Sequence, residues 1–462
     1  MSKVYELIKS WSCREGNVNS TQEILDWVDR RNKTLTVSIE KIPFPKDGFW
    51  YLDETDGYIR NRKNTFFQLA GLRQYADGQI VCEQPVILQN EIGYLGIICK
   101  MIDGTLNFLM QAKIEPGNVN AIQISPTIQA TKSNFTQAHG GKAPAYLDFF
   151  SHSSDYDIIV DQIQSEQSSR FYKKRNRNIL IDIGTSEIEV LDSHKWMTLG
   201  QIKELMKYPN LVNMDTRTVL SCIPFSIMKK DEDEDEKIRD LFKDKALFDS
   251  IFGKTDNPLP SIFNSINNYK MYTDLKTELI PLTELESWTI TDNEIVCDHD
   301  YDFKIIYCNI EIEGREVRKW DQPLVEAIGK AVFGLFTCVD NGCRYFLVKG
   351  KPEVGCFDGI ELGPVVQMEP SNPRNDLDTV ESFFMQKLEN NEGIIKDVFL
   401  SEEGGRFYHE QNRNIIIGIN KDEIKELPNG YFWVRYSTLN NIVQYNNFLN
   451  IQLRNLITLL DI

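Results

Sequence analysis

The sequence has little positive charge. Its 51 Lys and Arg residues are outnumbered by 68 Asp and Glu residues, which leaves a formal net charge of -17. Nucleic-acid-binding proteins carry a basic footprint, and attachment to anionic lipid needs a basic surface. The composition therefore argues against nucleic-acid and membrane partners. It leaves room for an anionic small molecule, because a local basic pocket can form in an acidic protein.

Long apolar runs and paired cysteines are missing as well. No stretch approaches the roughly 18 consecutive apolar residues that a membrane-spanning helix needs, and the start, MSKVYELIKSW, lacks the apolar core of a signal peptide. Nine cysteines are scattered without a CxxC pair, which favours reduced thiols. Cys338 and Cys343 flank an Asp-Asn-Gly turn, as expected of a hairpin rather than of half a metal site. We therefore expect a cytoplasmic protein without a metal centre.

The stretch 108–141 combines two predicted strands with an unusual polar face. Apolar and polar residues alternate up to Lys113 and again from Ile122 to Ser125, with Pro116 and Gly117 at the turn between them. Side chains two apart share a sheet face, so one face is apolar and the other polar. Amides and hydroxyls on the polar face suit hydrogen bonding to a sugar; a solvent-facing side of the sheet is the alternative. The residues of this polar face are Gln111, Lys113, Glu115, Gln123, Ser125, Thr127, Gln129 and Thr131.

The chain contains an internal duplication. The segment SEQSSRFYKKRNRNI at 165–179 matches SEEGGRFYHEQNRNI at 401–415, with nine of fifteen positions identical. Gln84-Pro85 recurs as Gln322-Pro323, and Phe108-Leu109 recurs as Phe346-Leu347, each 238 residues later. A repeat of this size is a whole domain, because solenoid units span only about 20–50 residues.

Four segments follow from the duplication. Residues 1–49 form an N-terminal extension with a helix and a strand, 50–224 the first repeat, 225–287 a connection, and 288–462 the second repeat. The connection begins with the charge run MKKDEDEDEK and continues with helical spacing of apolar residues. Strands dominate each repeat and helices close it, beginning in the first repeat with a capping box of Thr198 and Gln201. The predicted class is α+β, a tandem duplication of two domains joined by an acidic helical linker.

Several motifs resemble the NDP-hexose 2,3-dehydratase family of deoxysugar biosynthesis. The first half carries FLMQAKIEPGN, SPTIQATKSN, KWMTLGQI and NMDTRTVLSCIP, and the second carries WDQP, FLVKGK, ELGPVVQ and SEEGGRFYHEQNR. The resemblance implies two Nudix-like mixed-sheet domains, a homodimer, a substrate similar to dTDP-4-keto-6-deoxyglucose, and a C-3 ketoreductase as the functional partner. The Nudix box GX5EX7REUXEEXGU is missing, and with it the metal-binding glutamates of pyrophosphate hydrolysis.

The implied reaction removes H-3 and the C-2 hydroxyl to give a 2,6-dideoxy-3,4-diketo sugar. The C-4 ketone acidifies H-3 and serves as the electron sink, so no cofactor is expected. The protein must supply a base, an acid and a donor to the enolate oxygen. The candidate catalytic residues are His139, Lys113, Glu115 and Glu166.

His139 is a candidate base because its ordinary pKa lies near neutrality; a surface histidine in a loop is the alternative. Lys113 is expected to polarise the C-4 carbonyl or bind phosphate, with Glu115 as an acid, a base or, more simply, its ion-pair partner. Glu166 recurs as Glu402, so it serves catalysis or the structure of both repeats.

Further residues are expected to bind the substrate. Arg170 and Arg177 lie in the densest basic run and suit a diphosphate, although a solvated face is the alternative. Asp215 and Arg217 lie near a predicted helix N-terminus, where an anion is favoured; a local Asp–Arg pair is the alternative. Trp196 is a candidate for stacking on the base, with a position in the aromatic core as the alternative. Glu403 and Arg406 are expected to reach the site from the second repeat. The remaining candidates are Gln111, Gln123, Ser125, Thr127, Gln129, Thr131, Ser133 and Asn134.

The two repeats are predicted to be unequal. Ser125 becomes Gly363, and Thr131 becomes Glu369, so the polar face is thinner in the second copy. We therefore expect the chemistry on the first repeat, with the second as scaffold or as a secondary nucleotide site. Two alternatives remain open: another lyase or epimerase acting on a 4-keto nucleotide sugar, and a non-catalytic nucleotide-sugar-binding protein.

Overall fold

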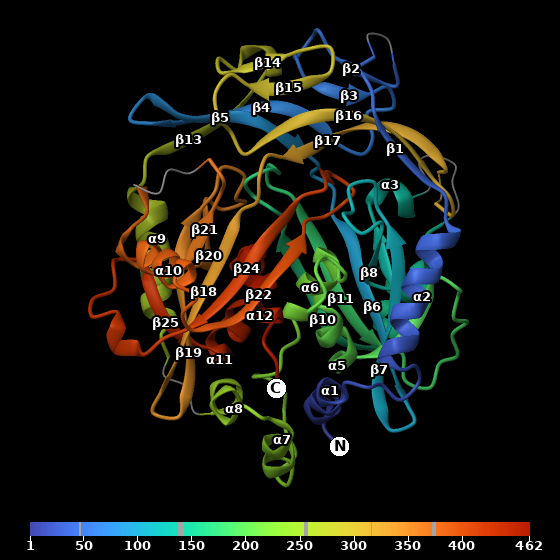
Figure 1. Cartoon of the computed structure of the whole chain (residues 1–462), viewed down its shortest axis with the longest axis vertical. Helices are drawn as coiled ribbons and strands as arrows, with labels where there is room; N and C mark the ends of the chain where they lie inside the picture. Colours follow the sequence, from blue (N-terminus) through green and yellow to red (C-terminus); the bar gives the residue numbers. More distant parts are fainter. Residues whose placement is uncertain (46–47, 137–142, 254–256, 316, 372–375) are drawn as a thin grey trace.

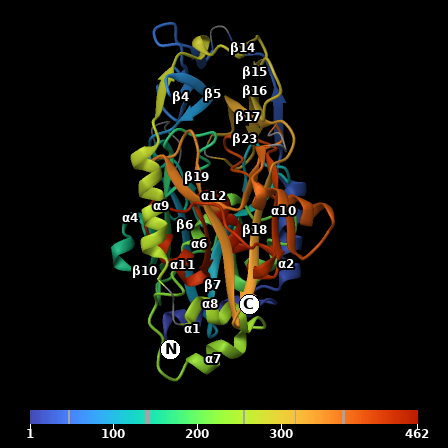
Figure 2. The same ribbon diagram turned by 90° about the vertical axis from the view of Figure 1, so that its left-hand side faces the viewer.

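Four β-sheets in two layers form the protein. The computed structural model describes residues 1–462 except 46–47, 137–142, 254–256, 316 and 372–375. Two seven-stranded sheets stand side by side, and two smaller sheets lie across one end of them (Figure 1). Figure 2 shows the same layers from the side, with the smaller sheets stacked beyond the ends of the larger ones. The α+β class with mixed sheets is confirmed.

The large sheet of the first repeat has the order β10-β11-β6-β7-β12, with β8 paired to β7 and β9 to β6. The sheet is mixed, because β11 runs parallel to β6 whereas the other described strand pairs of the sheet are antiparallel. Its strands are β6 (Gly93–Ile102), β7 (Thr105–Ile114), β8 (Ile122–Ser125), β9 (Ile128–Ala130), β10 (Asp157–Ser165), β11 (Arg175–Asp182) and β12 (His194–Thr198). The predicted strand pair is β7 and β8, in which Gln111 lies opposite Ser125 and Lys113 opposite Gln123.

The large sheet of the second repeat copies this arrangement. Its order is β20-β19-β18-β24-β22, with β21 paired to β18 and β25 to β19, and β24 runs parallel to β18. Strand β19 begins at Cys343, 238 residues after β7 begins at Thr105. Its strands are β18 (Val332–Asp340), β19 (Cys343–Pro352), β20 (Ile360–Pro364), β21 (Val366–Met368), β22 (Ile394–Ser401), β24 (Gln411–Gly418) and β25 (Tyr431–Arg435).

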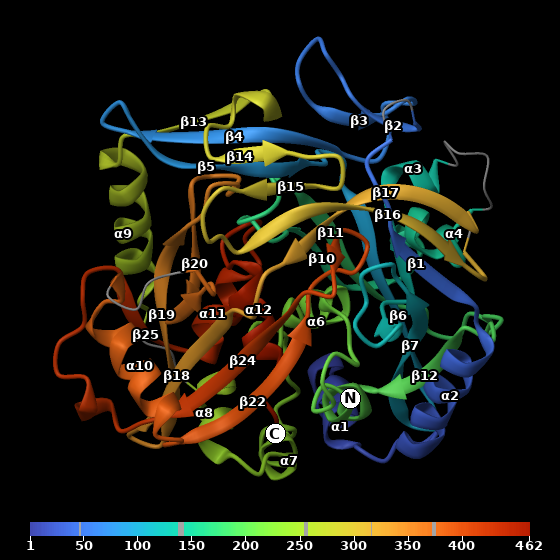
Figure 3. The same cartoon turned by 45° about the horizontal axis from the view of Figure 1, so that its top comes forward.

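The two smaller sheets exchange strands between the repeats. The first contains β2 (Trp50–Leu52), β3 (Ile59–Asn61), β4 (Gln68–Ala76), β5 (Gln79–Leu88) and β13 (Leu275–Ile280). The second contains β1 (Val37–Lys41), β14 (Trp288–Ile290), β15 (Glu294–Cys297), β16 (Phe303–Ile312), β17 (Lys319–Ala327) and β23 (Phe407–Tyr408). Strand β1 precedes the first repeat but pairs with β16, whereas β13 precedes the second repeat but pairs with β4 (Figure 3). The small sheet of each repeat therefore includes a strand from the segment that precedes the other repeat.

Helices cover the sheets and end each repeat. They are α1 (Lys3–Ser12), α2 (Thr21–Thr34), α3 (Lys132–Phe135), α4 (Leu147–Ser151), α5 (Leu199–Leu205), α6 (Met214–Ser221), α7 (Asp235–Leu241), α8 (Lys245–Phe252), α9 (Leu259–Tyr272), α10 (Thr379–Glu389), α11 (Tyr436–Ile442) and α12 (Ile451–Thr458). Short 3₁₀ turns lie at η1 (Ser153–Asp155), η2 (Leu282–Glu284) and η4 (Lys421–Glu423). The predicted capping box of Thr198 and Gln201 begins α5. The connection 225–287 contains α7, α8 and α9, and it also supplies β13. None of the described helices is long and apolar enough to cross a membrane.

The repeats share one interior. A single cluster of buried apolar side chains includes Phe108 of the first repeat and Phe346 of the second. Helices α6 and α12 contact each other at its centre. Arg217 of α6 donates to Asn455 of α12, and Arg454 of α12 donates to Thr218 of α6. The same contact is thus made twice, once in each direction.

Two glycines fit the repeats together at their turns. The Gly117 N–H donates to the Gly404 carbonyl at 2.7 Å, and the Gly355 N–H donates to the Ser168 carbonyl at 2.8 Å. A Cβ atom on Gly117 would lie 1.6 Å from the carbonyl oxygen of Phe407, so only glycine fits this approach. The turn after β7 is therefore fixed against the loop that follows β22.

Candidate functional site

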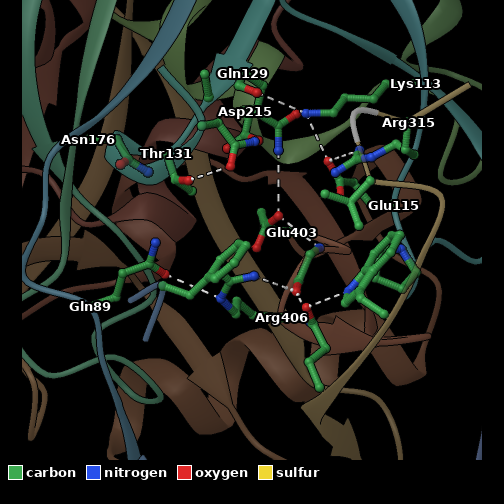
Figure 4. Close-up of a pocket in the computed structure, with 18 of the residues that line it drawn as sticks. Gln89, Lys113, Glu115, Gln129, Thr131, Asn176, Asp215, Arg315, Glu403 and Arg406 are labelled. Atoms are coloured by element: carbon green, nitrogen blue, oxygen red, sulfur yellow. Dashed lines mark hydrogen bonds and ion pairs between the residues drawn. The ribbon is translucent and has the colours of Figure 1, made fainter. Parts of the chain in front are cut away.

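A cavity of about 500 Å³ lies where the layers meet. The first repeat supplies most of its lining from β6, β7, β9, β11 and α6. The second repeat supplies Arg315 and residues of the β16–β17 hairpin, together with Glu403, Gly405 and Arg406 from the loop after β22. Figure 4 shows polar side chains of both repeats converging on this space. The site thus depends on the packing of the two repeats.

Lys113, Glu115 and Arg315 form a fixed ionic group on one wall. The Lys113 ammonium lies 2.8 Å from Glu115 Oε1 and donates to the Gln129 carbonyl at 3.0 Å. Arg315 Nη1 lies 3.1 Å from the same carboxylate oxygen. Burial by itself would raise the pKa of Glu115, but Arg315 and Lys113 lower it to about 2. Glu115 is therefore a permanent anion that holds two cations at the cavity.

Glu403 and Asp215 are carboxyls of a different kind. Burial raises the pKa of Glu403 to about 7, although the neighbouring Arg406 opposes the rise. Glu403 Oε1 accepts the Gly405 N–H at 2.8 Å and the Gln129 amide at 3.5 Å. Asp215 is 1% exposed, and neither carboxyl oxygen has a hydrogen-bond partner among the described residues. Burial, with Glu166 and Glu403 nearby, raises the pKa of Asp215 well above its ordinary value.

Glu166 and Lys174 face each other through Asn176. The Asn176 amide donates to Glu166 at 2.7 Å, while the Lys174 ammonium donates to Asn176 Oδ1 at 2.9 Å and to the Glu91 carbonyl at 2.6 Å. Burial raises the pKa of Glu166 and lowers that of Lys174 to about 8. Burial therefore brings the pKa of the acid and the pKa of the base closer together.

Another part of the lining is aromatic and comes from the smaller sheets. Trp50 lies on β2, Phe66 lies in the loop between β3 and β4, and Trp320 lies on β17 of the other small sheet. The Trp50 indole N–H donates to the Asp321 carbonyl at 2.7 Å, which joins the two sheets at this wall. Four lining residues of this side are exposed and mark the cavity mouth: Phe49, Lys63, Val317 and Lys319. The cavity therefore has an aromatic, cationic mouth and a carboxyl-rich interior.

Many of the predicted site residues line the cavity. They are Lys113, Glu115, Gln129, Thr131, Asn134, Glu166, Asp215, Glu403 and Arg406. Arg406 donates to Gln89 at 3.2 Å, and its guanidinium lies 4.2 Å from the centre of the Phe67 ring. His139 lies outside the described residues, as does the side chain of Ser133.

Part of the polar face is buried in protein contacts instead. Thr127 donates to Leu109 within its own sheet and accepts the Ile98 N–H at 2.9 Å. The Gln123 amide donates to Ser401 at 2.7 Å across the repeat interface, and Ser125 accepts from the Asn213 amide at 3.0 Å. Gln111 is not among the cavity-lining residues either. The expectation of one continuous sugar-binding face therefore needs correction, because the second repeat covers part of it.

Four other predicted residues lie away from this cavity. Arg217 donates to the Val212 and Ser401 carbonyls at 2.5 and 2.7 Å. Trp196 belongs to the apolar core on the outer side of the first large sheet. Arg170 pairs with Glu369 of the second repeat at 3.3 Å, and Arg177 pairs with Asp161 at 2.6 Å. Their described contacts stabilise the fold and do not bring them to the cavity.

Sequence reasoning missed the aromatic mouth and Arg315. No sequence pattern indicated that Trp320 and Phe66 line the same space. Among the described residues, no group of three or more His, Cys, Asp or Glu side chains is arranged to hold a metal ion.

Comparison with known proteins gives a consistent result over both repeats. The family model described as NDP-hexose 2,3-dehydratase matches residues 21–223 and 260–460. A dTDP-4-dehydro-6-deoxy-alpha-D-glucopyranose 2,3-dehydratase of Saccharopolyspora spinosa is 35% identical over 447 residues, covering 95% of this chain and 90% of the relative. Proteins of the same description from Amycolatopsis orientalis and Streptomyces violaceoruber are 32% and 35% identical, over 96% and 93% of this chain and 90% and 95% of their own lengths. The chain therefore belongs to the NDP-hexose 2,3-dehydratase family.

Proposed function

We propose that this protein removes water from dTDP-4-keto-6-deoxyglucose between C-2 and C-3. The cavity supports this proposal most directly, because it places proton-carrying carboxyls and fixed cations in a closed interior behind an aromatic mouth. Relatives that share this chain's full span carry the same activity in their names.

The reaction needs two proton transfers and one stabilised anion. A base takes H-3, and the electrons of the C–H bond pass into the C-4 carbonyl to form an enolate. The enolate electrons return to form the C-2 to C-3 double bond, and the C-2 oxygen leaves as water with a proton from an acid. The resulting enol gains a proton at C-2 and loses one from its oxygen, which gives the 3,4-diketo sugar. Each acid or base contributes typically about 10²- to 10⁴-fold.

The cavity suggests how the substrate lies. The nucleotide base is expected at the mouth, between Trp320 and Phe66, with the diphosphate near Lys63 and Lys319. The sugar then reaches the carboxyl-rich interior. Lys113, held by Glu115 at 2.8 Å, is positioned to stabilise the oxygen at C-4 as it gains charge.

The finer organisation is part of the proposal. The repeats 50–224 and 288–462 are proposed to be Nudix-like domains, with 1–49 and 225–287 as extension and linker, in a cytoplasmic homodimer. A separate C-3 ketoreductase is the proposed consumer of the diketo product, since vicinal diketones are reactive. His139 remains a candidate for the base, and Glu166 a candidate for proton exchange with Lys174.

Incubation with dTDP-4-keto-6-deoxyglucose, a C-3 ketoreductase and its reduced nicotinamide tests the proposal. Mass spectrometry should show a product that has lost one water and gained two hydrogens. Retained mass with solvent deuterium at C-3 would identify an epimerase instead. Unchanged substrate with measurable binding would identify a non-catalytic binding protein.

A further inference from the structure

The two repeats differ at two of the acids that line the cavity. Cavity-lining Glu115 and Glu166 correspond to Glu353 and Glu402 of the second repeat, so an acid stands at both places. Asp215 is the second residue of α6, and the second residue of α12 is Gln452. Glu403 lies two residues after β22, and Gln167 lies two residues after β10. Of these four acids, only Asp215 and Glu403 have an amide at the equivalent position.

Amide replacement keeps the shape of the side chain, but it turns one acceptor oxygen into an NH2 donor and removes a titrating proton. A carboxyl that served only packing could be exchanged for an amide in either repeat. Here two carboxyls line the cavity, and amides occupy the two equivalent positions. This is the pattern expected if proton transfer takes place at only one of the two sites. Asp321, another lining acid, accepts from Tyr307 at 3.1 Å and Asn309 at 3.4 Å and is thus engaged in its own sheet.

A chain of hydrogen bonds connects the start of α6, which carries Asp215, to Glu403. Asn213, the N-cap of α6, lies two residues before Asp215 and donates to Gln129 Oε1 at 3.2 Å. The Gln129 amide then donates to Glu403 at 3.5 Å. Figure 4 draws Asp215, Gln129 and Glu403 in one close group of side chains. The second repeat keeps the first part of this chain of hydrogen bonds, because Asn450 donates to Gln367 at 2.9 Å.

The surroundings of Glu403 and Asp215 suit these two carboxyls to different parts of a proton transfer. Glu403 accepts the Gly405 N–H at 2.8 Å and lies beside Arg406, and both stabilise its anion. Asp215 faces Glu166, Glu403 and Glu115 as well as Lys113, and its oxygens have no donor among the described residues. A buried carboxyl without donors holds its proton. Glu403 is thus suited to accept a proton and Asp215 to give one.

We propose that Glu403 of the second repeat removes H-3 and that Asp215 of the first repeat protonates the departing C-2 hydroxyl. This assignment rests on the proposed dehydration. In the reaction, Glu403 gains the proton from C-3, the C-2 to oxygen bond breaks, and water leaves with the proton of Asp215. Exchange with solvent then restores both groups.

The test uses Glu403→Gln and Asp215→Asn, which copy the amides of the second repeat. In D₂O without reductase, Asp215→Asn should still place deuterium at C-3 of unreacted substrate while water loss falls about 10²- to 10⁴-fold. Glu403→Gln should lose both exchange and water loss to a similar extent. Glu361→Gln is the matched control, a buried acid that accepts from Ser165 and does not line the cavity, and it should keep wild-type turnover.

A substrate with fluorine in place of the C-2 hydroxyl separates the roles further. Fluoride needs less help from an acid, so this substrate should restore elimination by Asp215→Asn but not by Glu403→Gln. In wild-type protein, activity on the hydroxyl substrate should fall at high pH as Asp215 loses its proton, and the fluoro substrate should escape that fall. This wild-type measurement shows whether an acid assists the departure of the C-2 oxygen even where a variant does not fold.

Three results would overturn the assignment while leaving the dehydration intact: wild-type water loss in either variant, exchange retained by Glu403→Gln, or equal falls at high pH for the two substrates. Loss of exchange in His139→Ala together with retention in Glu403→Gln would give the base role to His139. If wild-type protein removes no water from the substrate, the proposed function itself fails, and that result is distinct from all of these.

Discussion

The cavity of the first repeat and the equivalent region of the second show how a duplicated fold becomes unequal. In the first, Thr131 lines open space, and Arg406 lies beside Glu403. In the second, Glu369 replaces Thr131 and pairs with Arg170 at 3.3 Å, while Glu410 stands where the first repeat has Lys174. The backbone frame is the same in both, so a few side-chain exchanges decide which region keeps open, titratable groups.

The comparison also shows what symmetry preserves. The arginines of α6 and α12, the glycines of the two turns and the carboxylate-to-asparagine contacts after β10 and β22 all recur. Each of these contacts holds the repeats together or shapes their loops. These recurring contacts therefore belong to the frame that the two repeats share.

The largest expected effect concerns the symmetric arginines. Arg217→Met and Arg454→Met should each lower the free energy of unfolding by about 3 kcal/mol or more, because each leaves buried carbonyls without a donor. The two losses, measured by urea denaturation, should be similar. Arg239→Met, at an exposed pair with Asp249, is the control and should change little. A large loss in only one of the two arginine variants would contradict the symmetric description.

Replacing Thr131 with glutamate, the residue at the equivalent position of the second repeat, should weaken substrate binding in the cavity. Thr131→Glu adds an acid beside the lining carboxyls and offers Arg406 the partner that Arg170 has in the second repeat. The KM for the nucleotide sugar should rise about tenfold or more, equal to about 1.4 kcal/mol. Steady-state kinetics provide the measurement, with Glu369→Thr as the reverse change. An unaltered KM in Thr131→Glu would show that the substrate does not reach this wall.

Two buried glutamates, Glu361 of the second repeat and Glu115 of the first, should affect the pH dependence of stability with opposite signs. Burial raises the pKa of Glu361 to about 8, so its contribution to stability is complete below its unfolded pKa of about 4.5 and is lost as pH rises to about 8. Glu361→Gln should therefore flatten the decline of unfolding free energy over that range by up to about 1.4 kcal/mol per pH unit.

Glu115 provides the opposite case. Arg315 and Lys113 overcome burial and lower its pKa to about 2, so its stabilisation is present above about 4.5 and is lost as pH falls to about 2. Glu115→Gln should change the acid side of the stability curve. Unfolding titrations of both variants from acid to alkaline pH check the two signs, and a change in the same direction for both would refute the comparison.

The smallest effect is expected at a matched pair of surface ion pairs. Arg177 with Asp161 and Arg413 with Asp397 both show 2.6 Å contacts at equivalent places on β11 and β24. Double-mutant cycles should give about 0.2–1 kcal/mol for each pair, with similar values. A raised KM in Arg177→Met, without a counterpart in Arg413→Met, would instead support the predicted diphosphate role of Arg177.

Much of the architecture could be predicted because it depends on local patterns. The β7–β8 pair followed from alternation around Pro116 and Gly117, and α5 followed from its capping box. Matching segments 236 or 238 residues apart revealed the duplication. The strand exchange by β1 and β13 could not be predicted, because edge pairing depends on which sheet lies nearby in the folded chain rather than on the strand's own sequence.

Local patterns in the chain were sufficient to predict the two repeats, their α+β class and the motifs of the family, and they identified several acids and cations of the cavity. Which of these residues meet could be read only from the folded structure. Glu403 lies 188 positions after Asp215 in the sequence, yet Gln129 donates to it beside α6. The folded structure also shows that Gln123, Thr127 and Arg217 do not line the cavity. Buried polar groups need hydrogen-bond partners, and these three find them in the other repeat or within their own sheet.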